Sequence, residues 1–458
     1  MQKTEYDILH FTRFSNTTIW SVNYSAFDNI STHYSVVELS KVMKRVKEPI
    51  TIKDELTYKR ITVRLYGQGV HQRDELLGKD IGTKRQFVVH AGQLVASRID
   101  ARNGAFGIIP DGLDGAIVTN DFWLFDVKGA LPQFLMMVLS SAQFQQHWQA
   151  QSSGTTNRQR VNEDDLLATK IPLPSINEQT ALVEKYNETF AESEELNKKA
   201  NNLETEIEDY LFQQLTILPL SSQKTNNSLL VKTNFKNLVG WGARINCNPI
   251  KPQEMFQSNR YKNARLEYFG ELNPITKFPT DINEISFIPM ECVSDIYGEV
   301  IETYDGNTSD SKGYTKFKEK DILWAKITPC MQNGKCAIAK NLKNGFGYGS
   351  TEFHVFRANR NALPEYIYCF LRSKRLREVA ISYFTGSVGQ QRVGADFLSA
   401  LTIPKLPIFS DSSDVMTQEK LVRHVFNIKR QIKELNNAAD SLRSRAKKDF
   451  GEAIFGET

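Results

Sequence analysis

Residues 171–179 read IPLPSINEQ, and this stretch marks the boundary between a globular segment and a long helix. Its two prolines cannot continue a helix, whereas Ser175 followed three residues later by Glu178 forms a capping box that begins one. From Glu178 to Leu215 the chain contains no Gly or Pro. The sequence therefore predicts an uninterrupted helix within residues 175–217.

Apolar side chains recur along this helix at alternating spacings of four and three residues, which is typical of a coiled coil. The C-terminal segment, residues 417–458, carries a second and more regular pattern of the same kind. The predicted seam consists of Leu182, Tyr186, Leu196, Leu203 and Ile207 in the first helix, and of Leu421, Val425, Ile428, Ile432, Leu435 and Leu442 in the second.

These two helices could each pack on their own domain or could pair with one another. The net charge is −7 over residues 175–217 and +3 over residues 417–458, so attraction favours pairing with one another. The first helix delivers the chain to a second globular segment, which in turn begins the second helix. An antiparallel pair needs no long return connection and is therefore the predicted arrangement.

The globular segments form an internal repeat with an offset close to 230 residues. GQLVASRI at residues 92–99 matches KDILWAKI at 320–327, and GTTNRQRV at 154–161 matches GSVGQQRV at 386–393. Leu-Pro pairs at 131–132 and 363–364 match, as do Ile-Pro pairs at 171–172 and 403–404. Each half therefore contains the same landmarks in the same order.

Between the landmarks, short apolar runs separated by Gly turns predict strands, and residues 133–149 and 365–382 predict helices. The predicted fold class is α/β (mixed α+β), with two repeated globular domains separated by two long helices that pair as an antiparallel coiled coil. The predicted boundaries are 1–174 for the first domain, 175–217 for the first helix, 218–416 for a linker and the second domain, and 417–458 for the second helix.

The composition of the chain argues against a membrane-spanning protein and against a disulfide-bonded one. The 458 residues carry a formal net charge of +4 and contain no apolar run long enough to cross a membrane. The five cysteines leave one over from any disulfide pairing and include no CxxC pair. We expect a cytoplasmic protein with reduced thiols and no membrane partner.

The chain has a globular segment, the stretch GTTNRQRV, then IPLP, and then NEQ at the start of a long helix, and this order is repeated once. In this organisation it resembles the specificity subunit of type I restriction–modification systems. The second half departs from this pattern, because an insertion separates IPKLP at 403–407 from TQE at 417–419. The resemblance implies two target-recognition domains, each reading one half of a split double-stranded DNA sequence.

The resemblance also implies partners. The paired helices would dock two methyltransferase subunits, and restriction subunits would join through the complex. S-adenosylmethionine, ATP and Mg²⁺ are expected on those partner subunits, whereas this chain is expected to hold no cofactor or metal ion and to contain no catalytic residue.

Duplex binding requires Lys and Arg to neutralise phosphates and polar side chains to reach base edges. Candidates in or beside predicted loops are Lys84, Arg85, Arg98, Arg102, Arg158 and Arg160 in the first half, and Lys316, Lys318, Lys320, Lys326, Lys335, Gln390, Gln391 and Arg392 in the second. Arg160 and Arg392 occupy matching positions, which favours a shared structural role at least as much as a base contact. Side chains that read different bases should differ between the halves.

Two other classes of function stay open. Pro110-Asp111 and Asp126-Val127-Lys128 resemble the PD-DxK pattern of a divergent nuclease, although Asp111 lies in a Pro-Asp-Gly turn that favours Asp for local hydrogen bonding. The repeats could also bind proteins rather than DNA. No phosphate-binding GxxxxGK[ST] loop and no [DN]PP[YF] methyltransferase motif occurs. GFGYG at 345–349 is interpreted as a tight strand entry with packed rings.

Overall fold

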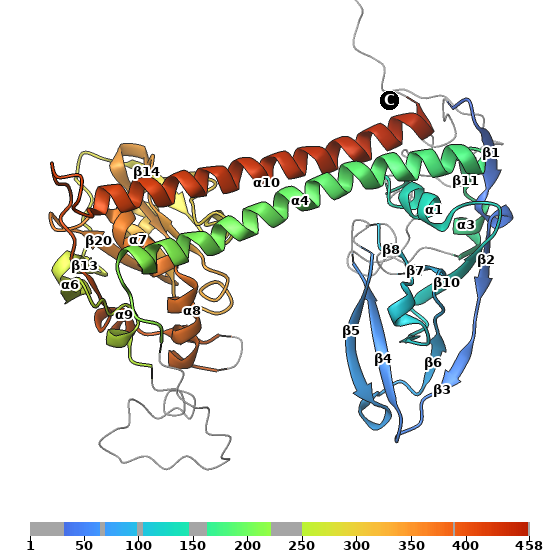
Figure 1. Cartoon of the computed structure of the whole chain (residues 1–458), viewed down its shortest axis with the longest axis horizontal. Helices are drawn as coiled ribbons and strands as arrows, with labels where there is room; N and C mark the ends of the chain where they lie inside the picture. The colour runs from blue at the N-terminus through green and yellow to red at the C-terminus, as the bar shows by residue number, and fades with distance from the viewer. Residues whose placement is uncertain are drawn as a thin grey trace, which may run out of the picture. The chain divides into compact units, whose positions relative to one another are not determined.

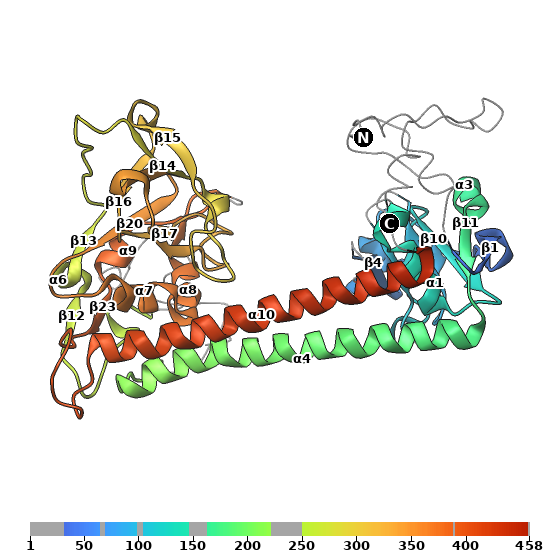
Figure 2. The same ribbon diagram turned by 90° about the horizontal axis from the view of Figure 1, so that it is seen from above.

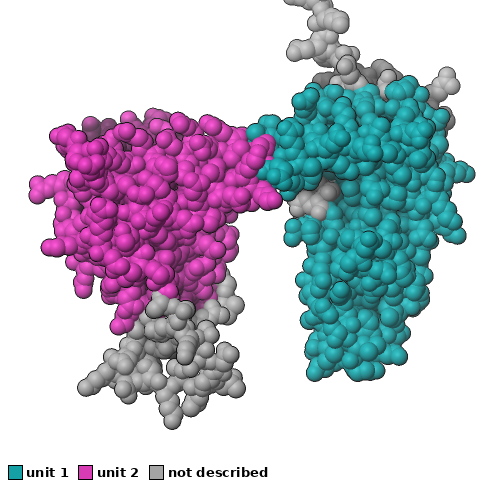
Figure 3. All heavy atoms as spheres, viewed as in Figure 1, with its two compact units in different colours: residues 1–195, 438–458 teal, residues 196–437 magenta. Residues whose placement is uncertain are grey.

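The computed structural model describes residues 32–64, 69–98, 104–145, 163–220, 250–387 and 390–456. Its contacts divide the chain into two compact units, one of residues 1–195 and 438–458 and the other of residues 196–437 (Figure 3). Each unit therefore combines a globular segment with a portion of both long helices. The boundaries at 174, 217 and 416 stay predictions, since this division falls inside the helices.

The described globular part of the first unit is built on three sheets (Figure 1). β1 pairs with β11, a four-stranded sheet has the order β2-β10-β7-β8, and a five-stranded sheet has the order β3-β6-β9-β4-β5. The strands are β1 Ser35–Glu38, β2 Met43–Val46, β3 Pro49–Thr51, β4 Thr57–Val63, β5 Val70–Leu77, β6 Arg85–Val88, β7 Leu94–Ser97, β8 Phe106–Ile108, β9 Ile117–Val118, β10 Phe122–Val127 and β11 Lys170–Leu173, with helices α1 Pro132–Leu139 and α3 Glu163–Ala168.

The described globular part of the second unit is built on four sheets. Their orders are β12-β23, β13-β20-β17-β18, β15-β14-β19-β16 and β21-β22. The elements are β12 Asn263–Arg265, α6 Leu266–Phe269, β13 Gly270–Leu272, β14 Glu284–Ile288, β15 Tyr304–Asn307, β16 Thr315–Lys318, β17 Ile322–Ala325, β18 Cys336–Ile338, β19 Phe346–Gly349, β20 Phe353–Ala358, α7 Pro364–Arg372, α8 Lys374–Ala380, β21 Phe384–Thr385, β22 Arg392–Val393, α9 Ala395–Ser399 and β23 Thr402–Pro404.

The two units share one topology. The order β13-β20-β17-β18 repeats β2-β10-β7-β8, and β16-β19-β14-β15 repeats β6-β9-β4-β5. The parallel pairing of β4 with β9 recurs as the parallel pairing of β14 with β19. The mixed α/β fold and the internal repeat are thereby confirmed, and β3 is an additional edge strand of the first unit.

The alternation of Gly and aromatic residues in β19 follows from its two faces. A Cβ atom at Gly347 would lie 2.5 Å from the Phe317 ring, and one at Gly349 would collide with the carbonyl oxygen of Ile288. On the other face, the Tyr348 ring packs 4.9 Å from the ring of Phe287. The predicted strand with packed rings is therefore confirmed, and glycine is required where the neighbouring strands approach.

The helix predicted over 365–382 is wrong as a single element, because α7 ends at Arg372 and α8 begins at Lys374. Ser373 leaves helical geometry, with φ −55° and ψ 146°, and its hydroxyl accepts the N–H of Leu376 to cap α8. In the first half, α1 ends at Leu139 and helical geometry resumes at residues 142–145. Residues 146–149 of that prediction lie outside the described ranges.

The two long helices are α4 Ile176–Gln214 and α10 Gln418–Phe455. The predicted capping box is confirmed at the start of α4, where the N–H of Ser175 donates to the Glu178 carboxylate and the N–H of Glu178 donates to the Ser175 hydroxyl. Thr417 caps α10 by accepting the N–H of Lys420. None of the described helices is long and apolar enough to span a membrane.

Within each unit, portions of α4 and α10 lie side by side (Figures 1 and 2). In the first unit the Tyr186 ring lies 6.3 Å from that of Phe450, and Arg443 ion-pairs with Glu194. In the second unit Tyr210 stacks on His424 at 3.8 Å. In the first unit, the later of these two residues in α4 contacts the earlier of the two in α10, so the two helix portions run antiparallel there.

The predicted seam residues are buried to different degrees. Leu182 and Tyr186 pack against the core of the first unit, while Leu196 and Leu442 are partly buried. Ala200, Ile428 and Ile432 form a small apolar cluster of the second unit, against which Leu203, Ile207 and Leu435 pack. Leu421 and Val425 are buried in the main core of that unit.

The end of α10 belongs to the core of the first unit. Phe450, Ile454 and Phe455 are buried in the same cluster as Phe134 and Val183. The Phe450 ring lies 5.9 Å from the Phe134 ring in an edge-on arrangement. The last described turn of the chain therefore completes a core that begins near residue 39.

Two buried glutamines hold the helix starts in matching ways. Gln179 accepts the N–H of Leu131 and donates to the carbonyl of Pro174, both at 2.8 Å. Gln418 accepts the N–H of Leu363 at 2.8 Å and donates to the carbonyls of Asn361 and Leu406, both at 2.9 Å. Both glutamines have an exposed fraction of 0%.

These contacts show how the second half keeps the same helix start despite its insertion. Leu363 and Leu406 match Leu131 and Pro174 at one offset, whereas Gln418 matches Gln179 only after the insertion. The additional residues are accommodated between Pro407 and Thr417, where the Lys420 ammonium donates to the loop carbonyls of Ser412, Ser413 and Val415. The insertion therefore leaves the helix start in place.

Candidate nucleic-acid interface

Arg98 and Lys326 occupy equivalent positions in the two units. Each directly follows the third strand in the order of its four-stranded sheet, β7 or β17. The N–H of Arg98 donates to the carbonyl of Asp121 at 2.8 Å, and the N–H of Lys326 donates to the carbonyl of Glu352 at 2.9 Å. The repeated backbone geometry therefore presents one basic side chain at the same place in each unit.

The neighbours of these basic side chains differ. Trp123 pairs with Ala96 across the first sheet, and in the second sheet the matching positions hold His354 and Trp324. The guanidinium of Arg98 lies 5.4 Å from the centre of the Trp123 ring. The two units therefore share the pairing of these strands but differ in the side chains at the paired positions.

Arg45, which the sequence analysis did not single out, also lies over Trp123, at 5.7 Å. Its guanidinium contacts the Glu163 carboxylate at 3.5 Å, and burial lowers its pKa although Glu163 opposes that shift. No local pattern marks Arg45, because its partners come from β10 and α3, far along the chain. Two arginines thus flank one buried ring in the first unit.

His354 is held in the neutral form by its hydrogen bonds. Asn273 donates its side-chain N–H to Nδ1 at 3.1 Å, so Nε2 carries the proton and donates it to the carbonyl of Val393 at 2.9 Å. The Asn273 side-chain oxygen accepts the N–H of Val355. Burial, together with the charge of Lys326, lowers the pKa of His354.

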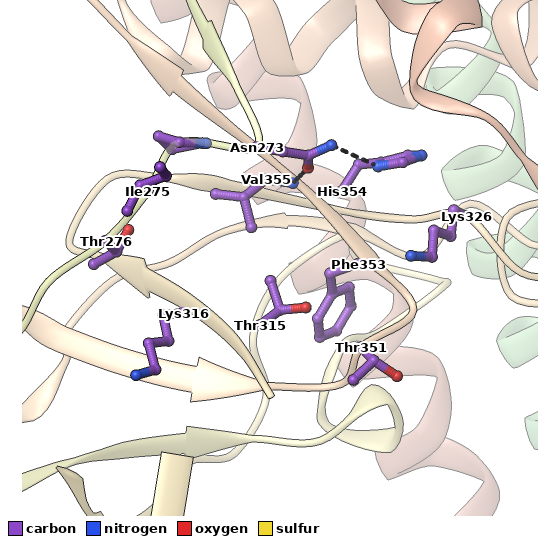
Figure 4. A pocket seen from close by; sticks show the side chains of 11 residues that line it. Asn273, Ile275, Thr276, Thr315, Lys316, Lys326, Thr351, Phe353, His354 and Val355 are labelled. Atoms are coloured by element: carbon purple, nitrogen blue, oxygen red, sulfur yellow. Dashed lines mark hydrogen bonds between the residues drawn. The ribbon is translucent and has the colours of Figure 1, made fainter. Parts of the chain in front are cut away.

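A pocket with a volume of about 500 Å³ opens beside this histidine in the second unit (Figure 4). Its lining contains two lysines and three threonines but no Asp or Glu. The lining residues are Asn273, Pro274, Ile275, Thr276, Thr315, Lys316, Lys326, Thr351, Phe353, His354 and Val355. The pocket therefore joins two predicted DNA-binding lysines, one on β16 and one directly after β17.

Other predicted basic residues have structural partners or are exposed. The Lys84 ammonium bonds to the Asp54 carboxylate at 2.6 Å and to the carbonyl of Gly78. The Lys335 ammonium donates to the carbonyl of Met290 at 2.9 Å. Arg85, Lys318 and Lys320 are exposed. Arg102, Arg158 and Arg160 lie outside the described residues.

Arg392 braces its own loop. Its guanidinium binds both carboxylate oxygens of Glu352, at 2.8 and 2.7 Å, and also donates to the carbonyl of Gln390. The bond to Arg392 lowers the pKa of Glu352. The carbonyl of Gln391 accepts the N–H of Thr328. These contacts agree with the structural role considered for the matched Gln-Arg positions.

The two carboxylates of the PD-DxK-like pattern, Asp111 and Asp126, lie on different kinds of secondary structure. Asp111 begins a single turn of 3₁₀-helix over Asp111–Leu113, whereas Asp126 lies on β10 and accepts a hydrogen bond from Gln93 at 3.1 Å. Lys128 donates its backbone N–H to the carbonyl of Val42. Within the described ranges no three His, Cys, Asp or Glu residues gather closely enough to hold a metal ion.

The following matches to known proteins all point to the same family. The sequence model described as the type I restriction modification DNA specificity domain matches residues 32–208 and 259–437, once in each half. The type I restriction enzyme EcoEI specificity subunit of Escherichia coli is 37% identical over 159 residues, covering 34% of this chain and 27% of the relative. The EcoAI specificity subunit of the same organism is 39% identical over 145 residues, covering 31% of this chain and 25% of the relative.

The chain thus spans about a quarter of the length of these curated relatives. A solved structure concerned with complex assembly and conformational transition of the type I R-M system aligns with a TM-score of 0.51 and 15% identity, covering 92% of this chain and 97% of that one. It supports the fold alone. Together the sequence matches confirm the resemblance that the sequence analysis identified.

Proposed function

This chain belongs to the type I restriction modification DNA specificity family, and from that membership we propose that it is the sequence-specificity subunit of a type I restriction–modification complex. Each globular segment would read one half of a bipartite double-stranded DNA target. The proposal includes a non-catalytic role in the cytoplasm for the chain itself.

The observation that carries this proposal is a repeated backbone with different side chains. The backbone N–H groups of Arg98 and Lys326 form equivalent hydrogen bonds. The Arg98 side chain nevertheless lies over Trp123, whereas Lys326 lies near a neutral His354. Two readers with one architecture but different contact chemistry suit a target whose halves differ in sequence.

The remaining partners follow from the same role. Two methyltransferase subunits would dock on α4 and α10, and restriction subunits would join through the assembled complex. S-adenosylmethionine would serve methyl transfer on the methyltransferase subunits, while ATP and Mg²⁺ would be bound by partner subunits during translocation and cleavage.

Exchange of the first reader is the direct test of two-domain recognition. When residues 32–174 are replaced by the corresponding segment of a relative with another target, we expect one half-site to change and the other to persist. The measurement is a genome-wide map of methylated adenines in cells that carry the complex. The matched control exchanges residues 259–404, which should alter the opposite half-site. A change in both half-sites from either exchange would contradict separate readers.

The purified chain alone is expected to show no methyl transfer and no DNA cleavage. Transfer of label from S-adenosylmethionine to duplex DNA, and nicking of a plasmid with Mg²⁺ present, are the two measurements. Cleavage that disappears on Asp126→Asn would support the nuclease alternative instead. Sequence-independent methylation by a complete complex, with unaltered assembly, would support a protein-binding scaffold.

A further inference from the structure

The pocket in the second unit offers hydrogen-bond donors and positive charge to a ligand. In the described part of the chain, the ammonium groups of Lys316 and Lys326 form no ion pair with a carboxylate within 4.0 Å. By contrast, Lys343 pairs with both Glu284 and Asp305. The two pocket lysines therefore keep their charge available for another molecule.

The remaining polar groups separate into those already used and those still available. Both ring nitrogens of His354 and the side-chain amide of Asn273 are hydrogen-bonded, and the Thr276 hydroxyl accepts a bond from Arg357. For the side-chain hydroxyls of Thr315 and Thr351 the described residues supply no hydrogen-bond partner. A ligand would thus meet two ammonium groups and two hydroxyls (Figure 4).

Such a lining fits an anion that accepts hydrogen bonds through several oxygens. An adenine or cytosine edge presents a donor, which an ammonium group cannot accept, whereas a guanine edge presents only the acceptors N7 and O6. The test below separates a guanine from a phosphate, because the loss of a guanine contact would change the sequence of the methylated half-site. Ile275, with an exposed fraction of 84%, stands at the pocket and offers an apolar contact. A sugar attached to the anion could pack there.

We propose that this pocket binds one backbone phosphodiester of the target duplex, with Lys316 and Lys326 on its oxygens and the adjoining deoxyribose against Ile275. The inference rests on the proposed function and adds a subsite to it. Lysine ammonium groups neutralise phosphate as point charges, so the contact orients the duplex on the second domain without reading sequence. The Lys316 ammonium also lies 5.0 Å from the centre of the Phe278 ring, a cation–π contact that positions it beside the pocket.

The test is the salt dependence of duplex binding by the full complex. We compare the wild type with Lys316→Met/Lys326→Met, and use Lys340→Met/Lys374→Met as a control that removes two charges from the same unit outside the pocket. Losing one phosphate contact should reduce the slope of log K against log salt by about 0.9. The control should keep the wild-type slope, and the methylated half-sites should remain the same in both variants.

Several results would overturn the subsite. If the pocket variant keeps the wild-type slope while the wild type binds its target with normal salt dependence, the subsite is wrong and the proposed function stands. If the wild-type complex prefers no sequence, the proposed function itself fails. Binding of inorganic phosphate or ATP to the full chain that needs both lysines, with no change in duplex binding, would assign the pocket to a free anion.

Folding of the variants is checked by thermal melting of the complexes. Should the double methionine variant melt early, the single variants Lys316→Gln and Lys326→Gln carry the comparison. Each is expected to weaken duplex binding relative to a single Lys374→Gln control. Equal binding by all three would again contradict the subsite.

Discussion

Gln418→Met is expected to lower the free energy of unfolding by about 3–5 kcal/mol, because it leaves one buried and two partly buried backbone groups without a partner, and a fully buried group costs about 1–3 kcal/mol. Those groups are the N–H of Leu363 and the carbonyls of Asn361 and Leu406. Methionine matches glutamine in length but forms none of these bonds. The loss is large compared with the 5–15 kcal/mol that stabilises a typical domain.

Urea denaturation of the full chain measures this effect. Gln179→Met, which removes two backbone bonds, should cost less than Gln418→Met. The matched control is Gln431→Met on the exposed face of α10, which should change stability by no more than about 0.5 kcal/mol. If Gln418→Met behaves like this control, the glutamine does not hold the helix start.

Lys429→Met is expected to have the opposite sign and to stabilise the protein at pH 7. The Lys429 ammonium lies 4.5 Å from the centre of the Tyr368 ring and 5.4 Å from that of Phe426. Burial, with the nearby charge of Arg372, lowers the pKa of Lys429 from 10.5 to about 8. That difference corresponds to a cost of roughly 3 kcal/mol for keeping the amine charged in the folded state.

The pH dependence follows from the lowered pKa. Between pH 8 and 10.5 the unfolded chain binds the proton that the folded chain releases, so stability should rise with pH across this window. Lys429→Met should remove this rise and add up to about 3 kcal/mol at pH 7. Urea midpoints at pH 7 and pH 9.5 provide the comparison.

Lys433→Met serves as the matched control on the same helix. Its ammonium forms an exposed ion pair with Glu299 at 2.7 Å, and such pairs contribute about 0–1 kcal/mol. This variant should retain the rise in stability above pH 8. A loss of stability in Lys429→Met at pH 7 would mean that the two aromatic rings, together with the hydrogen bond from Lys429 to the Tyr368 hydroxyl, stabilise the charge more than burial opposes it.

The sequence predicted the features that depend on local pattern. A capping box at Ser175 and the absence of Gly or Pro beyond it were enough to place α4. Matching landmarks were enough to predict a repeated fold, since both halves keep the same order of strands. The Gly and aromatic alternation of β19 was also interpretable, because a strand with one crowded face needs glycine there.

Features that depend on distant partners could not be predicted in the same way. Nothing near Gln418 indicates that it bonds to Leu363, 55 residues away. The break at Ser373 needs one extended residue inside an otherwise helical pattern. The pocket joins Lys316 with Lys326, and only the pairing of strands shows which of many lysines share a cavity.

The burial of Phe450, Ile454 and Phe455 in the first unit has a consequence for biosynthesis. A ribosome synthesises these residues only after the whole of the second unit, residues 196–437, so the core of the first unit must wait for them while the second unit can already fold. Contacts of such long sequence separation form slowly, and the waiting segment exposes apolar surface to aggregation. A truncation that removes residues 450–455 would therefore damage the domain that was synthesised first.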